Sequence, residues 1–176
     1  MAPEKYSVPM RALHWLMAIC IMGMIFSGWY MAGLDDTAPD KFSLYPWHKS
    51  FGVLLLGLIV IRIIVRLASA LPDIQATLPN YERNLARLAH LLLYLLMVIV
   101  PVSGFIMSDA GGHDILFFGL ELPDLLETNK QLGGTAHEMH EYAGYFLLGV
   151  VVVHILGALK HRFMDHPEND VLKKTL

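Results

Sequence analysis

Long apolar stretches recur four times along the chain, and polar segments separate them. The first, residues 12–34, contains no Asp, Glu, Lys or Arg over 23 residues. This is enough to cross the hydrocarbon of a membrane at about 1.5 Å per residue. Lipid offers the backbone no hydrogen-bond partner, so unbroken apolar stretches of this length are expected to be helices. The pattern therefore predicts an all-α integral membrane four-helix bundle, a single membrane domain over residues 1–176 with spans at about 11–33, 46–67, 85–108 and 137–162.

Two polar segments carry expectations of their own. The loop 109–136 contains "LFFGLELPDLL", which has the pattern of a short amphipathic helix lying on the membrane surface. The polar stretch "DHPENDVLKKTL" follows the last span, and it is expected to be mobile or lightly packed beneath the bundle.

Basic residues are divided unevenly between the two ends of the predicted bundle. Cytoplasmic loops carry the excess of Lys and Arg in membrane proteins, so the more basic end, with both termini, is expected to be cytoplasmic. The opposite, outer end carries ten Asp and Glu residues. Ten basic residues lie at the inner end and three at the outer end: Lys5, Arg11, Arg62, Arg66, Arg83, Arg87, Lys160, Arg162, Lys173 and Lys174 against Lys41, Lys49 and Lys130.

Composition narrows the class further. Of the 176 residues, 55% are hydrophobic and only 16% are charged, as expected for an integral membrane protein. The one cysteine, Cys20, lies inside an apolar stretch, so the sequence predicts no disulfide framework and no thiolate metal cluster. The net charge of −3 gives no reason to expect nucleic acid as a partner.

Four histidines fall at two matched depths of the predicted bundle. His140 and His154 are 14 residues apart on the fourth span, so both project from nearly the same helix face, roughly 21 Å apart along the axis. His48 shares the outer level with His140, and His14 shares the inner level with His154. Two imidazoles at equal depth, facing each other across a bundle, can ligate a planar macrocycle from both sides. The spacing therefore predicts two haems, one at each level.

Other readings of these histidines exist. A single histidine of this kind is commonly an interfacial residue or a hydrogen-bonded polar contact. Zinc also suits imidazole, and "HEMH" at 137–140 offers two outer ligands, which would fit a small histidine-lined metal transporter. Zinc leaves the inner pair unexplained.

The four spans resemble the helices of the bacterial cytochrome b561 family. The stretches that carry the resemblance are "ALHWLMAICIMGMIFSGWYM", "HKSFGVLLLGLIVIRIIVRL", "AHLLLYLLMVIVPVSGFIMS" and "HEYAGYFLLGVVVVHILGALKHRF". The resemblance implies a di-haem b protein of the bacterial inner membrane, with bis-histidine ligation by the pairs His14/His154 and His48/His140. His137 offers a competing alignment for the outer ligand, and His140 is preferred because its 14-residue step to His154 matches the family.

The same resemblance implies electron exchange with ubiquinone. The best-defined activity of the family is the oxidation of superoxide at the outer side with reduction of ubiquinone to ubiquinol, which would make the chain a superoxide:ubiquinone oxidoreductase. The alternative is a membrane-anchor cytochrome b subunit that relays electrons between quinone and a separate redox partner protein. The acidic outer end would suit a basic partner and would repel superoxide, unless Lys49, next to His48, steers the anion locally.

Polar residues near the inner level are candidates for the quinone site. His90, His161 and Arg11 are the candidates, although His90 could equally hydrogen-bond a haem propionate or a neighbouring helix, and His161 could be a solvated residue at a helix end. Arg62 and Arg66 are either contacts to haem propionates, because guanidinium binds carboxylate in a fork, or ordinary interfacial anchors.

Overall fold

Four long helices make up most of the chain. The structure is a computed structural model, and it describes residues 3–35, 37–72 and 78–176. The helices are α1 (Val8–Ala32), α2 (Pro39–Ala68), α3 (Asn80–Ala110) and α4 (Lys130–Phe163). All four are long and apolar enough to cross a membrane, which confirms the predicted all-α membrane bundle. Each helix begins before the span predicted for it, and α2 and α4 both begin seven residues earlier, at Pro39 and Lys130.

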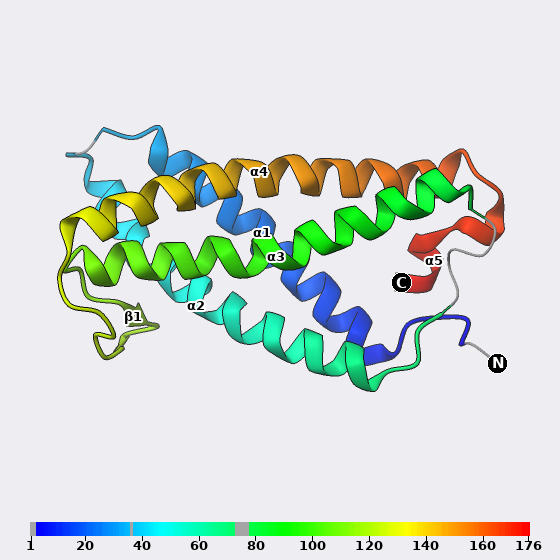
Figure 1. The fold of residues 1–176 in the computed structure, drawn as a ribbon, viewed down its shortest axis with the longest axis horizontal. Coiled ribbons are helices and arrows are strands. Elements are labelled where there is room, and N and C mark those ends of the chain that lie inside the picture. Colours follow the sequence, from blue (N-terminus) through cyan, green and yellow to red (C-terminus); the bar gives the residue numbers. More distant parts are fainter. Residues whose placement is uncertain (1–2, 36, 73–77) are drawn as a thin grey trace.

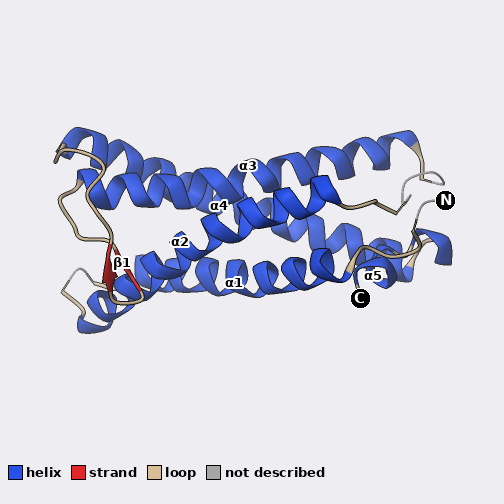
Figure 2. Ribbon diagram, turned by 90° about the horizontal axis from the view of Figure 1, so that it is seen from below, coloured by secondary structure: helices blue, strands red, loops and turns tan. Residues whose placement is uncertain are grey.

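The helices are arranged so that the two ends of the bundle differ in character. α3 packs along α4, α1 along α2, and α2 also against α3. Figure 1 shows the two termini and the α2–α3 connection at one end, with the α1–α2 and α3–α4 connections at the other. Figure 2 shows α3 and α4 running beside each other, with α1 on the opposite side of the bundle. The basic residues predicted for the inner end therefore do lie at one end, that of the termini.

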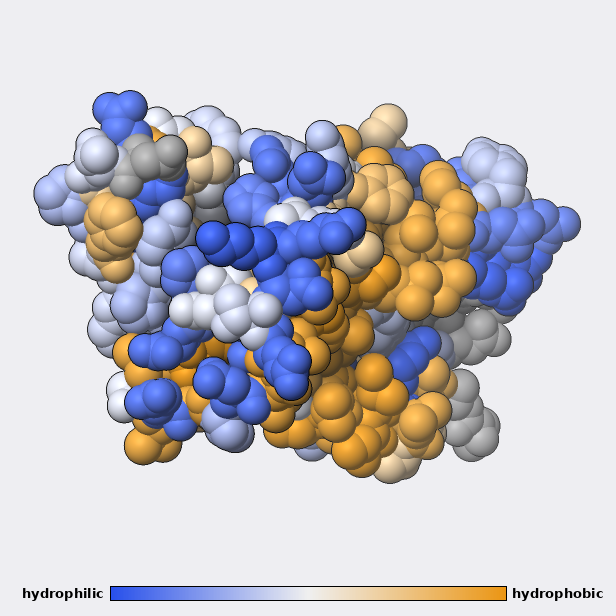
Figure 3. Space-filling view, turned by 60° about the vertical axis from the view of Figure 1, so that its left-hand side comes forward, coloured by the Kyte–Doolittle hydropathy of each residue, from blue (hydrophilic) through white to orange (hydrophobic). Residues whose placement is uncertain are grey.

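Apolar side chains lie both between the helices and on the outer surface of the bundle. Two buried clusters hold the helices together, one around Ile59 on α2 and the other around Leu96 on α3. Large apolar residues on the flank remain exposed, among them Ile19, Phe26 and Leu67. Figure 3 shows apolar side chains on the flank of the helices and polar side chains gathered toward the ends. An apolar flank between polar ends is the surface that a bilayer requires.

The segment "LFFGLELPDLL" forms a β-hairpin, so the prediction of a short amphipathic helix was wrong. Strands β1 (Leu116–Phe117) and β2 (Leu120–Glu121) pair antiparallel. Between them Phe118 and Gly119 have φ angles of 49° and 92°, and positive φ at both central residues is the condition for a two-residue turn that matches strand twist. A glycine is tolerated in a short helix, but Gly119 is here the turn residue at which the chain reverses.

The polar tail folds back against the start of α1. A short 3-10 turn (Pro167–Asn169) leads into α5 (Val171–Thr175), whose first turn is capped by the Asp170 carboxylate. The indole nitrogen of Trp15 donates to the carbonyl oxygen of Thr175 at 2.9 Å, and the amide of Tyr6 donates to that of Lys174 at 3.1 Å. Of the two expectations for the tail, packing beneath the bundle is the one the structure supports.

Ser50 fastens the hairpin to α2, and its removal is a test of this fold. Its hydroxyl accepts from the amide of Phe118 at 3.0 Å, and its one hydrogen lies between two carbonyl acceptors, Pro46 at 2.7 Å and Leu116 at 2.8 Å. We predict that Ser50→Ala removes the hydrogen-bond partner of the Phe118 amide and weakens hairpin docking by about 1–3 kcal/mol. Hydrogen exchange of the hairpin amides should accelerate about tenfold. The exposed Ser43, changed to Ala, is the control; equal exchange in both variants would contradict the role of Ser50.

Candidate functional site

The outer level contains two facing imidazoles. The ring centroids of His48 on α2 and His140 on α4 are 6.1 Å apart, with an angle of 80° between the ring planes. α2 and α4 are not direct packing neighbours over any length, so these side chains meet across the interior of the bundle. His137, the competing outer candidate, is exposed, which favours His140.

Hydrogen bonds orient both outer rings in the same way. The Nδ1 atom of His140 lies 2.8 Å from the carbonyl oxygen of Val100, and a carbonyl only accepts, so Nδ1 carries the hydrogen. The hydroxyl of Ser27 donates to the carbonyl of Met24 and lies 3.0 Å from Nδ1 of His48, so it is free to accept from that nitrogen. In both rings Nε2 then keeps its lone pair, which is the state a metal ligand needs.

Glycines give the outer rings the space they occupy. A Cβ atom added at Gly104 on α3 would lie 2.9 Å from both Cε1 and Nδ1 of His140. A Cβ added at Gly28 on α1 would lie 3.4 Å from Cε1 of His48. The first distance is too short for a side chain to be tolerated without moving the ring.

The inner level contains three imidazoles. The ring centroids of His14 on α1 and His154 on α4 are 6.3 Å apart, so the structure brings the predicted inner pair together. His90 on α3 lies against the same ring, with its centroid 5.5 Å from that of His154. The sequence placed His90 near this depth as a quinone candidate, and its direct contact with His154 was not anticipated.

Two arginines beside the inner level have no acidic partner among the described residues. One Arg62 nitrogen lies 3.3 Å from Nδ1 of His14, and another donates to the carbonyl of Met10 at 3.3 Å. The Arg66 guanidinium lies over the ring of Tyr94, 5.9 Å from its centroid. The Tyr94 hydroxyl is buried without a hydrogen-bond partner. These groups together could bind a carboxylate. Tyr94 was missed from the sequence, although it lies one helical turn after His90 on the same face.

The remaining predicted residues lie at the two ends of the bundle. Lys49 donates to the backbone oxygen of Asp114 at 2.9 Å, which holds its ammonium beside the outer level. At the inner end, Arg11 donates to the carbonyl oxygen of Leu176 in the tail, and His161 contacts Asp165. No contact joins Arg11, His90 and His161 in the part of the chain that the structure describes, so a shared quinone site is not formed by direct contacts.

Comparison with known proteins identifies the class to which this bundle belongs. A membrane four-helix bundle with facing histidine pairs is the arrangement expected of a haem-binding electron carrier. The family described as prokaryotic cytochrome b561 matches residues 5–170, and the chain belongs to this family.

Three relatives align with nearly the whole chain. "Cytochrome b561 homolog 2" of Escherichia coli (strain K12) is 35% identical over 99% of this chain and 92% of its own length. "Probable superoxide oxidase CybB" of Yersinia pestis is 27% identical over 92% and 90%, respectively. "Cytochrome b561 homolog 1" of Escherichia coli (strain K12) is 23% identical over 97% and 96%.

Membership of this family assigns transmembrane electron transfer and a b-type haem to the chain. The geometry fits that cofactor. Bonds between a transition metal and imidazole nitrogen are about 2 Å long, so a metal held between two opposed imidazoles puts their centroids roughly 6 Å apart. The two predicted pairs have separations of 6.1 and 6.3 Å.

Gly104 allows a direct test of the outer level. We predict that Gly104→Ala displaces the His140 ring and breaks its hydrogen bond to Val100, so that haem content falls and the reduced-minus-oxidised spectrum loses intensity. Gly134→Ala is the control, because nothing lies within 4 Å of a Cβ added there. Full haem content in Gly104→Ala would show that the space beside Gly104, which the His140 ring occupies, does not matter for haem binding.

Proposed function

We propose that the chain holds two b-type haems, one between His48 and His140 and one between His14 and His154. The observation that carries this is the similar ring separation at the two levels, 6.1 and 6.3 Å, in pairs that share one face of α4. A b-type haem between two imidazoles takes up and releases one electron at a time. Two such centres roughly 21 Å apart along α4 would carry electrons between the faces of the membrane.

Haem binding at the inner level would rearrange Arg62. A guanidinium only donates, so its present contact makes Nδ1 of His14 an acceptor. A His14 that binds iron through Nε2 must instead carry its hydrogen on Nδ1, and Arg62 must then turn away. Arg62, Arg66 and the unpartnered hydroxyl of Tyr94 would bind the carboxylates of the inner haem, as guanidinium–carboxylate pairing favours.

Superoxide is the electron donor we propose at the outer end. A relative with 27% identity bears the name probable superoxide oxidase. Superoxide gives up a single electron and needs no proton transfer, so the outer end needs only access and a favourable charge. Lys49 provides the charge: it follows His48 directly, and its contact is with a backbone oxygen.

Ubiquinone is the acceptor we propose at the inner end, in the region of His90, His161 and Arg11. Two superoxide anions, one quinone and two protons give two oxygen molecules and one quinol. We place this end on the cytoplasmic side of a bacterial inner membrane, because the basic residues gather there.

Purified protein tests this function without any other subunit. It is mixed with superoxide and a short-chain ubiquinone analogue, and haem reduction and quinol formation are followed spectroscopically. Rapid haem reduction followed by quinol formation is expected, and His140→Ala should abolish both. Haem that stays oxidised with superoxide, yet equilibrates with quinol, would favour the anchor-subunit alternative, which the acidic outer end would suit.

Lys49 should control the superoxide rate. We predict that Lys49→Glu lowers the second-order rate of haem reduction by superoxide about tenfold and reverses its salt dependence, because a local attraction becomes a repulsion. Lys130→Glu is the control: it makes the same charge change at the same end, ten residues, or roughly 15 Å, along α4 from His140. Equal losses in both variants would mean that only the overall field matters.

Arg66 should tune the inner haem. We predict that Arg66→Gln lowers the midpoint potential of one of two resolved haem transitions by about 50 mV, because a nearby positive charge favours the reduced form. Arg87→Gln, at an exposed position on α3, should leave both transitions in place. A redox titration in which Arg66→Gln matches wild type would remove Arg66 from the haem site.

A further inference from the structure

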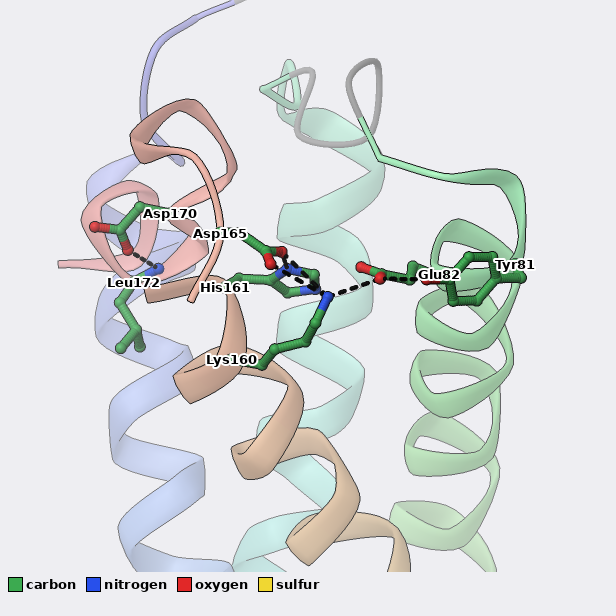
Figure 4. Close-up of polar contacts among 7 residues, drawn as sticks. All are labelled: Tyr81, Glu82, Lys160, His161, Asp165, Asp170 and Leu172. Atoms are coloured by element: carbon green, nitrogen blue, oxygen red, sulfur yellow. Dashed lines mark hydrogen bonds and ion pairs between the residues drawn. The ribbon is translucent and has the colours of Figure 1, made fainter. Parts of the chain in front are cut away.

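A hydrogen-bonded charge network lies at the end of α4, outside the haem levels (Figure 4). The Lys160 ammonium lies 2.7 Å from Oε1 of Glu82 on α3 and 3.2 Å from Oδ1 of Asp165. Asp165 also accepts a hydrogen bond from Nδ1 of His161, at 2.6 Å. The hydroxyl of Tyr81 donates to the same Glu82 oxygen at 3.0 Å. Asp165 thus joins a histidine to a lysine that reaches the surface.

The position of His161 relates this network to the inner level. His161 follows His154 by seven residues, two helical turns less about 20°, so both lie on one face of α4 roughly 10 Å apart. The side chains of His161 and Asp165 are only 13% and 17% exposed, whereas that of Lys160 is 40% exposed. The histidine therefore lies between the inner level and a charged group in contact with water.

The contact with Asp165 fixes what the imidazole can do. Because the carboxylate accepts the hydrogen of Nδ1, Nε2 is the nitrogen left to exchange a proton. The hydrogen bond from His161 holds the pKa of Asp165 below its usual range, against the opposing effect of burial, so the carboxylate is ionised at neutral pH. An ionised carboxylate on one nitrogen orients a histidine and stabilises its protonated form, as in catalytic histidine–aspartate pairs.

We propose that His161 delivers a proton to the bound quinone and that Asp165 is the positioning residue that makes it a proton donor. This inference rests on the proposed quinone reduction. Reduction to quinol takes two electrons, which arrive singly along the bundle, and two protons. The Nε2–H bond of the His161 imidazolium breaks as an O–H bond forms on one quinone oxygen. Water then returns a proton to Nε2, and the second quinone oxygen takes its proton from solvent.

Neighbouring charges set the conditions under which this donor works. Glu82 faces it from α3, with a carboxylate oxygen within 4.8 Å of a ring nitrogen of His161. Glu82 in turn contacts Lys160 and Tyr81. Arg162 is engaged by Asp170 of the following segment. The ammonium of Lys160 is paired with both Glu82 and Asp165. The charged group in direct contact with the imidazole is the carboxylate of Asp165.

A single-turnover assay tests the role of Asp165. Haem in the purified holoprotein is reduced chemically, a ubiquinone analogue is added, and haem reoxidation is followed over a range of pH. Asp165→Asn should slow reoxidation about tenfold at neutral pH and alter the pH profile, because the ring that donates the proton loses the carboxylate that orients it. His161→Gln should remove the pH dependence that this donor gives, and Asp165→Asn added to it should slow the reaction no further.

Asp170→Asn is the matched control, because it removes a charge from the same segment while an asparagine still caps α5. It should keep the wild-type pH profile. Suppose that wild type reoxidises with quinone, but Asp165→Asn keeps the wild-type pH profile or reoxidises no more slowly than Asp170→Asn. The role of Asp165 is then overturned, and the proposed function stands. If reduced wild type is not reoxidised by quinone, the proposed function fails and this inference fails with it.

Discussion

The need to satisfy imidazole nitrogens inside an apolar bundle is the constraint on which this structure depends. Unpaired polar groups are expensive in a membrane interior, and this chain places histidines of four helices there, at two levels. Hydrogen bonds to Ser27 and Val100 satisfy one nitrogen of each outer ring, and the other nitrogen is then in the state that a metal ligand needs. The packing of α3 along α4 and of α1 along α2 holds the opposed rings at a separation that suits a metal between them.

The fold was largely predictable because each apolar stretch is long, uncharged and flanked by polar residues. In lipid such a stretch has one stable conformation, so helix type and number followed directly, while the ends extended further than hydropathy alone indicated. The hairpin could not be found in this way. Its conformation depends on the turn at Phe118 and Gly119 and on a serine that is distant in sequence, whereas an amphipathic pattern in eleven residues is compatible with either structure.

The candidate site was predictable to the extent that depth along a helix can be counted. The spacing of His140 and His154 placed both on one face, and the depths of His14 and His48 supplied their partners. The groups around those rings could not be predicted from residue spacing. The positions of the Val100 carbonyl, of Gly104 and of the Tyr94 hydroxyl depend on how α3 is rotated against α4. The same holds for Asp165, which lies in a segment expected to be polar and loosely held.

The two ends of the bundle divide the chemistry between them. The outer end presents one lysine beside the histidine pair within an acidic surface, which suits a small anion with no proton requirement. The inner end gathers arginines, a third histidine and a charge network that reaches water, which suits an acceptor that needs both electrons and protons. This asymmetry gives the direction of electron flow that we propose.

The stoichiometry of haem is the most direct measurement of the central claim. We expect two b-type haems per purified chain, falling to one when either His48 or His14 is replaced by alanine, with a different half of the difference spectrum lost in each case. One haem per chain in the wild-type protein, or two haems in either variant, would contradict the assignment of one cofactor to each histidine pair.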